Sequence, residues 1–153
     1  MANTFSQIYL QFVFAVKGRQ SLIAKENKEE LHKYLTGLVQ KRKAKMLAVN
    51  CMPDHTHIFV GFKPVIFIPD FVKEIKVESN EFITNKKWVK GKFNWQDGYG
   101  VFSYSHSHID NVIKYVLNQE EHHRKKTFRE EYLELLQKFE IPFEDKYLFE
   151  FQD

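Results

Sequence analysis

The segment from Cys51 to Phe62 constrains the fold of this chain more than any other. Met52-Pro53-Asp54 is typical of a tight turn, and the residues from His55 onward then alternate as in a strand. Residues 46–50 read as the strand before the turn. Side chains two apart on a strand point to the same face, so the sequence predicts that His55 and His57 leave the sheet together.

Two neutral imidazoles that converge on one point can hold a divalent metal ion. They supply only part of a coordination shell, which leaves room for a further ligand and for a substrate. The His55-Thr56-His57 segment is therefore a candidate active centre, and residues that complete it are expected elsewhere in the chain.

The remaining pattern predicts the order β-α-β-β-α-β, followed by helices. This is the ferredoxin-like split β-α-β arrangement, an α+β fold in which an antiparallel sheet carries helices on one face. C-terminal helices follow, and the two histidines are expected on the face that the first helices leave open. The expected elements are a strand over 8–16, a helix capped by Asn27 and Glu30, strands over 46–50 and 55–62, a helix opening at Pro69, a strand region over 93–105 broken at Gly98-Tyr99-Gly100, a helix from Ser107 to about Arg124, a helix from Thr127 to Pro142, and a short docking strand over 147–151.

The bulk composition indicates one globular domain over residues 1–153, with a core of about 5–124 and a C-terminal helix and tail over 125–153. The length of 153 residues suffices for a hydrophobic core, and 43% of the residues are apolar. The one cysteine, Cys51, excludes an internal disulfide and fits a reducing compartment. We see no signal peptide and no apolar run of the roughly 18–20 residues that a membrane span needs, so a soluble cytoplasmic protein is expected.

Basic residues gather in three places, although the net charge is only +3. Each patch taken alone is compatible with an ordinary solvated face. The patch over residues 86–92 interleaves its lysines with tryptophan, as surfaces that stack nucleic-acid bases do. The residues that we predict to contact nucleic acid are Arg42, Lys43, Lys87, Lys90, Trp95 and His122.

The third predicted helix supplies groups that suit the histidine pair. Tyr115 and Gln119 lie off its apolar stripe, one turn apart on a shared face. A tyrosine hydroxyl is a poor nucleophile, with an unperturbed pKa of about 10, and needs a polarised electrophile. A divalent cation on two imidazoles and an amide oxygen would polarise a phosphate. The two histidines, Gln119 and Tyr115 together therefore suit a metal-assisted attack of the tyrosine on a phosphodiester. The alternative is that Tyr115 is an ordinary surface tyrosine.

Three segments resemble those of the small HUH-type, single-tyrosine transposases of bacterial insertion sequences. They are Met52–Val60 with its H-x-H motif, the aromatic-glycine segment Trp95–Ser103, and Tyr115-Val116-Leu117-Asn118-Gln119 with its Y-x-x-x-Q motif. The similarity extends from the first strand to about His123. Thr56 departs from the family, in which an aliphatic residue usually stands between the histidines.

The resemblance implies a bacterial enzyme that recognises hairpins at the ends of an element and cuts single-stranded DNA with Mg²⁺ or Mn²⁺. It implies a 5′-phosphotyrosine intermediate on Tyr115, metal ligation by His55, His57 and Gln119, and a homodimer whose active sites can be shared in trans. It leaves open which metal is used, whether the tyrosine acts in cis or in trans, and which hairpin is bound.

Other interpretations stay open at this stage. A related HUH endonuclease of the replication-initiator kind, a domesticated relative, and a non-catalytic single-strand-binding module on the same scaffold are the alternatives. His106-Ser107-His108 is a second H-x-H, but it falls at a strand-to-helix junction, where Ser107 suits a helix cap better.

Overall fold

The computed structural model describes residues 4–18 and 22–151. Its four described strands form one antiparallel sheet in the order β2-β3-β1-β4. The strands are β1 (Ile8–Ala15), β2 (Lys45–Met52), β3 (His55–Phe62) and β4 (Gly100–Tyr104). This confirms the predicted α+β, ferredoxin-like architecture, in which β1 and β3 are the central strands.

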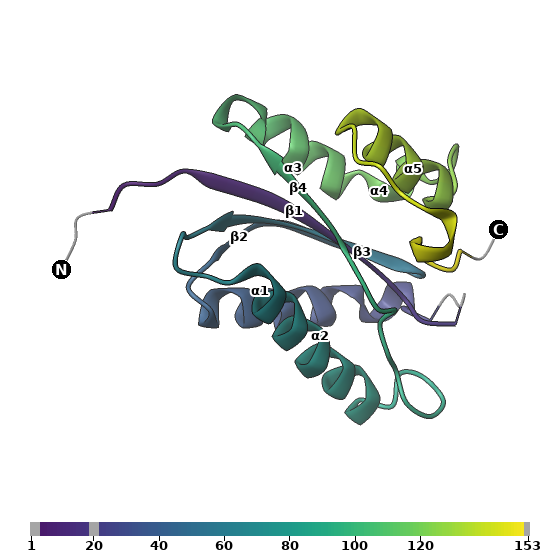
Figure 1. The fold of residues 1–153 in the computed structure, drawn as a ribbon. Coiled ribbons are helices and arrows are strands. Elements are labelled where there is room, and N and C mark those ends of the chain that lie inside the picture. Colours follow the sequence, from purple (N-terminus) through teal and green to yellow (C-terminus); the bar gives the residue numbers. More distant parts are fainter. Residues whose placement is uncertain (1–3, 19–21, 152–153) are drawn as a thin grey trace.

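Helices cover both faces of the sheet (Figure 1). The helices α1 (Lys28–Lys41) and α2 (Ile68–Asn85) lie on one face, where the alternation of β3 places Thr56, Ile58, Val60 and Phe62. Ile58, Val60 and Phe62 join Phe12 and Phe14 of β1 in the largest hydrophobic core. The Pro69 prediction is confirmed, because this proline stands in the first turn of α2.

The opposite face of the sheet is covered by α3 (Ile109–Leu117), α4 (Gln119–His122) and α5 (Phe128–Lys138). The sequence suggested that the face carrying the histidines is open, and this prediction is wrong, because these three helices cover it. One end of it packs Val112 and Val116 of α3 against Phe59, and the other packs α5 against Val13 and Ala15 of β1. The histidines lie between these two apolar clusters, which exclude water from them.

Several predicted boundaries differ from the observed ones. The helix expected from Ser107 to Arg124 is broken at Asn118, and a 3₁₀ turn at His106–His108, without a side-chain cap, takes the place of the Ser107 cap. The capping box of Thr127 with Glu130 is confirmed at the start of α5. Asn27 precedes α1 but makes no capping hydrogen bond, because a 3₁₀ turn at Lys25–Asn27 leads into that helix.

The C-terminal segment docks without forming the expected strand. Phe149 and Phe151 are buried against α5, after a 3₁₀ turn at Asp145–Tyr147. The side-chain amide of Gln96 substitutes for a strand partner: it donates to the carbonyl of Glu150 (2.7 Å) and accepts from the amide of Glu150 (2.7 Å). The same amide group donates to the carbonyl of Val16, so the tail is fixed next to the end of β1.

Candidate active centre

Strand β3 presents His55 and His57 from the middle of the sheet. His57 lies opposite Val13 of β1 and Asn50 of β2 in the strand register. The two imidazole rings are 5.1 Å apart between centroids, and their side chains are 1% and 0% exposed. The prediction that both rings leave the same face of the strand is confirmed.

A polar partner behind each imidazole fixes the ring. The Nδ1 atom of His55 donates to the carboxylate of Asp54 (2.7 Å), and the Nδ1 atom of His57 donates to Oε1 of Gln11 (2.7 Å). Gln11 in turn donates from its amide nitrogen to the hydroxyl of Tyr104 (2.8 Å). With Nδ1 engaged, the Nε2 atoms are the ones turned inward, which is the usual arrangement behind a metal-binding histidine.

The break at Asn118 starts α4 and buries Gln119 beside the imidazoles. Its Oε1 atom lies 3.3 Å from Nε2 of His55 and 2.9 Å from Nε2 of His123. Its side chain is fully buried, whereas neighbouring positions of the helix are exposed. The structure thus brings the predicted third residue to the histidine pair.

Glu131 of α5 enters the same cluster from the other side. Its Oε1 atom lies 3.1 Å from Nε2 of His57, 3.5 Å from Nε2 of His55 and 3.0 Å from Nε2 of His123. The ligand atoms of His55, His57 and Glu131 all lie within 4.8 Å of one another. Two imidazoles and a carboxylate are a donor set that divalent cations bind, so these residues fit a metal ion.

Tyr115 lies at the edge of this cluster. Its ring stands edge-on to His57, with 5.7 Å between centroids, and its hydroxyl donates to Oε2 of Glu131. Burial and the negative charge of Glu131 both raise the pKa of Tyr115. A pocket of about 560 Å³ opens beside the ring and is lined by Asn111, Lys114, Tyr115, Leu117, Asn118 and His122. The tyrosine is therefore half-buried at the junction of the cluster and an outward-facing pocket.

The protonation equilibria of the cluster depend on these contacts. Burial alone would lower the pKa of His55, but hydrogen bonds to Asp54 and Glu131 outweigh it and raise the pKa to about 9. For His57 burial dominates and lowers the pKa. Burial would raise the pKa of Glu131, yet the surrounding imidazoles hold it well below its usual range. Glu131 is therefore an ionised carboxylate, the negative charge at the centre of the cluster.

Two of the residues predicted to contact nucleic acid are engaged within the protein. Trp95 was wrongly assigned, because its ring is 5% exposed, packs on Phe14 and Phe93, and donates from Nε1 to Ser79. A buried indole offers no face to a base. Arg42 forms ion pairs with Glu74 and Glu78 of α2, which offset its charge.

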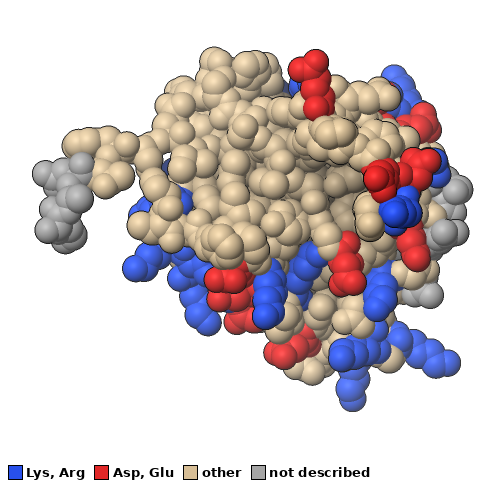
Figure 2. Space-filling model, in the orientation of Figure 1, with Lys and Arg blue, Asp and Glu red and all other residues tan. Residues whose placement is uncertain are grey.

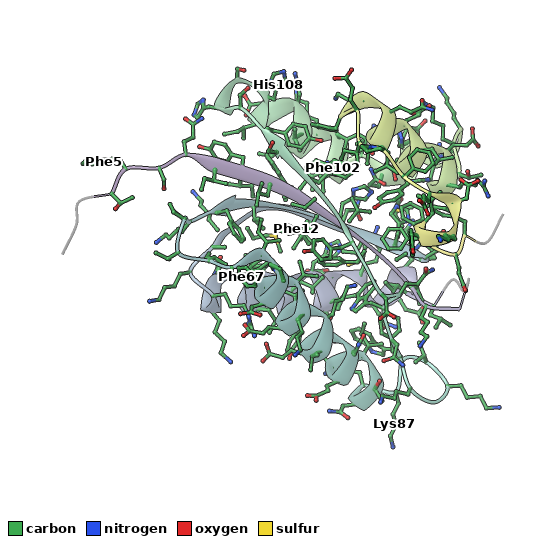
Figure 3. The ribbon with its side chains drawn as sticks, viewed as in Figure 1. Phe5, Phe12, Phe67, Lys87, Phe102 and His108 are labelled. Atoms are coloured by element: carbon green, nitrogen blue, oxygen red, sulfur yellow. The ribbon has the colours of Figure 1, made fainter. Side chains whose placement is uncertain are left out.

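The other predicted contacts are on the surface or near the tyrosine. Lys43, Lys87 and Lys90 are exposed. Lysine and arginine side chains gather in Figure 2 along the side of α1 and α2, and Lys87 lies at the far end of that layer in Figure 3. The ring of His122 lies 5.3 Å from that of Tyr115. His106 and His108 are exposed at the opposite end of α3 from the tyrosine, outside the cluster.

Sequence reasoning missed Gln11, His123 and Glu131. A signal for Glu131 was present, because it falls three residues after Phe128 and four before Leu135, on the stripe of α5 that faces the sheet. Carboxylates are almost never fully buried unless they are paired. Gln11 gave a similar signal, as a lone amide within an apolar strand.

Comparisons with known proteins agree with this geometry. Residues 4–119 match the family model described as "Transposase IS200 like". The ISDra2 transposase TnpA of Deinococcus radiodurans is 25% identical over 118 residues, which cover 74% of this chain and 84% of that protein.

Two solved structures share the fold. A Deinococcus radiodurans protein described as a transposase is 24% identical with a TM-score of 0.62, over 78% of this chain and 95% of that one. A REP-associated tyrosine transposase bound to a REP hairpin is 13% identical with a TM-score of 0.59, over 80% of this chain and 73% of that one. Among the described residues, no helix is long and apolar enough to cross a membrane.

Proposed function

Because the chain belongs to the IS200-like transposase family, we propose that it cuts and rejoins single-stranded DNA through a tyrosine–phosphate intermediate that requires a divalent metal ion. The observation that carries this proposal is the position of Tyr115. Its ring contacts His57, and its hydroxyl reaches the carboxylate that also faces both histidines. A nucleophile and a metal-binding group placed together are what phosphoryl transfer to a side chain needs.

The reaction assigns a role to each group. The Tyr115 oxygen attacks the phosphorus of a phosphodiester, a new O–P bond forms, and the bond from phosphorus to the 3′ oxygen breaks, leaving a 5′-phosphotyrosine and a free 3′-OH. The proton that the tyrosine gives up is balanced by the one that the 3′ oxygen gains. Attack of a 3′-OH on the phosphotyrosine reverses these steps and rejoins strands. A Mg²⁺ or Mn²⁺ ion held by His55, His57 and Gln119 would polarise the phosphate and stabilise its developing charge.

The pocket beside Tyr115 fits the approach of DNA to this centre. Lys114 and His122 line it and offer cationic or hydrogen-bonding groups to a phosphate, and Leu117 is 60% exposed at its edge. The solved relative that was bound to a REP hairpin is the basis for proposing that hairpins are the recognised element ends here too. A positively charged groove that follows the backbone is a usual feature of surfaces that bind single strands.

The test is covalent capture of DNA. The protein is incubated with Mn²⁺ and labelled single strands made from the DNA on either side of its gene, where the proposal places the hairpins, and adducts are separated on a denaturing gel. Tyr115→Phe should form no adduct and still bind the strand. Tyr147→Phe is the matched control, because Tyr147 is 78% exposed and far along the tail, and it should form adduct as the wild type does. An adduct with Tyr115→Phe contradicts the assignment of the nucleophile.

A second variant tests the metal. His57→Ala should lose Mn²⁺-dependent cleavage, whereas His108→Ala, at an exposed histidine outside the cluster, should keep it. Cleavage by His57→Ala at the wild-type rate removes the histidine pair from the mechanism.

A further inference from the structure

The two carboxylate oxygens of Glu131 have different partners. Within the described part of the chain, Oε1 faces imidazole nitrogens, those of His55, His57 and His123. Oε2 accepts hydrogen bonds from the hydroxyl of Tyr115 and from the amide nitrogen of Gln119 (2.9 Å). The side chain is 2% exposed, so water does not compete for either oxygen. Oε2 is thus satisfied by ordinary hydrogen bonds. The interactions of Oε1 depend on whether the imidazole nitrogens around it carry a proton or a metal ion.

The three imidazoles have no hydrogen to spare for Oε1 when they are neutral. Each has its Nδ1 atom next to an acceptor: Asp54 for His55, Gln11 for His57, and the main-chain carbonyl of Lys126 for His123 (2.8 Å). A neutral imidazole carries one N–H, so each Nε2 atom then brings a lone pair to the cluster. An ionised oxygen at 3.0–3.5 Å from these nitrogens needs a positive charge beside it, which either a proton on an imidazole or a metal ion can supply.

We propose that Glu131 is a ligand of the metal ion through Oε1, while Oε2 holds the hydroxyl of Tyr115 in place. The proposal rests on the proposed function for the presence of a metal and adds a ligand to it. The carboxylate supplies the negative charge that the imidazoles and the amide lack, and hard divalent cations such as Mn²⁺ and Mg²⁺ bind carboxylate oxygen more readily than imidazole nitrogen. One side chain then joins the metal to the nucleophile.

This ligand makes α5 part of the centre. The family model ends at residue 119, so Glu131 and His123 both lie beyond the matched segment. The helix is held on the sheet by Phe128, Tyr132 and Leu135, which pack against β1 and the tail. Packing of the C-terminal segment and binding of the metal are therefore coupled through a single carboxylate.

The test measures Mn²⁺ binding in the absence of DNA. The full chain is stripped with a chelator and titrated with Mn²⁺, and free Mn²⁺ is followed by its electron paramagnetic resonance signal. Glu131→Gln keeps the size of the side chain and removes its charge, and we expect the dissociation constant to rise at least about 10-fold. Glu134→Gln removes an exposed charge one turn away on the same helix and should bind Mn²⁺ as the wild type does.

The outcomes separate this inference from the proposed function. Loss of Mn²⁺ binding in both His57→Ala and Glu131→Gln supports it. Loss in His57→Ala with wild-type affinity in Glu131→Gln overturns the role of Glu131 and leaves the histidine pair as the metal site. No Mn²⁺ binding by the wild type overturns both, since protons on the imidazoles would then supply the positive charge. If circular dichroism shows that Glu131→Gln does not fold, Glu131→Asp replaces it. Wild-type Mn²⁺ affinity of that variant, whose side chain is shorter, again contradicts ligation.

Discussion

Asn50 of β2 holds the end of the tyrosine helix. Its amide nitrogen donates to the carbonyl of Val116 (3.0 Å) and lies 3.3 Å from that of Leu117, and the side chain is buried. The last carbonyls of a helix have no partner within the helix, and here a strand supplies one. The turn in which the helix stops, and hence the relative placement of Tyr115 and Gln119, depends on this amide.

Replacing Asn50 by Ala should destabilise the protein by about 1–3 kcal/mol, because it leaves buried carbonyl groups without a donor. The free energy of unfolding, measured by denaturant titration, checks this value. Asn85→Ala is the control, at an exposed position where α2 ends, and it should change the unfolding free energy by less than about 0.5 kcal/mol. Equal effects of the two substitutions would show that Asn50 does not anchor the helix.

The structure places the tyrosine and the histidines of one chain in contact, which gives a prediction about complementation. An equimolar mixture of Tyr115→Phe and His57→Ala should form no more adduct than the two variants do separately, because neither chain then contains a complete centre. The two variants are refolded together, so that mixed dimers form if the protein is a dimer. Recovery of adduct in the mixture would mean that Tyr115 acts on the histidines of a second subunit.

The exposed lysines that follow the end of α2 give a prediction about salt. Replacing Lys87 and Lys90 by Ala should weaken single-strand binding and reduce the slope of log affinity against log salt concentration by about 1.4, since each phosphate that a lysine neutralises on a single strand accounts for about 0.7 of that slope. The control replaces Lys33 and Lys41 of α1, which pair with Glu29 and Glu78. A salt slope that changes only in the control pair would place the DNA on α1 instead.

His32 gives a prediction about pH that is independent of the active centre. Its Nε2 atom accepts the main-chain N–H of Cys51 (2.9 Å), and burial, together with Lys28, lowers the pKa of His32 to about 4 from 6.5. A depressed pKa means that the unfolded chain binds this proton more readily. Stability should therefore fall as the pH drops from about 6.5 to 4 and change no further from this source below that range.

The size of this effect is about 1–2 kcal/mol, since the ring is partly exposed and solvent screens its charge. His32→Gln keeps an acceptor for the Cys51 amide and does not titrate, so its stability should decline less over that pH range. Parallel stability curves for the two proteins would exclude His32 as a source of acid sensitivity.

The sequence predicted the part of the site that depends on strand alternation and missed the part that depends on packing. His55 and His57 were paired correctly because a period of two residues fixes their face. Tyr115 and Gln119 were predicted to share a face of one straight helix, since nothing local shows that Asn118 ends α3. That break depends on Asn50, a residue distant in sequence whose contribution appears only when β2 lies beneath the helix.

The fold was predictable for a similar reason, and its C-terminal part was not. Hydrophobic periodicity gave the order of strands and helices through residue 104, with β3 placed at its observed bounds. The position of α5 on the sheet depends on contacts between segments that are distant in sequence. One of these is the ring of Phe128 in α5, which stacks on the ring of His55 with 4.0 Å between centroids. No period in the sequence encodes such a contact.

Glu131 has a consequence for how members of this family are sorted. It lies twelve residues beyond the last matched residue, 119, so the family match does not depend on this carboxylate. If the carboxylate is a ligand, the matched segment contains only part of the metal site. The H-x-H motif alone would then not report the full charge of the metal site, and position 131 would have to be read beside it.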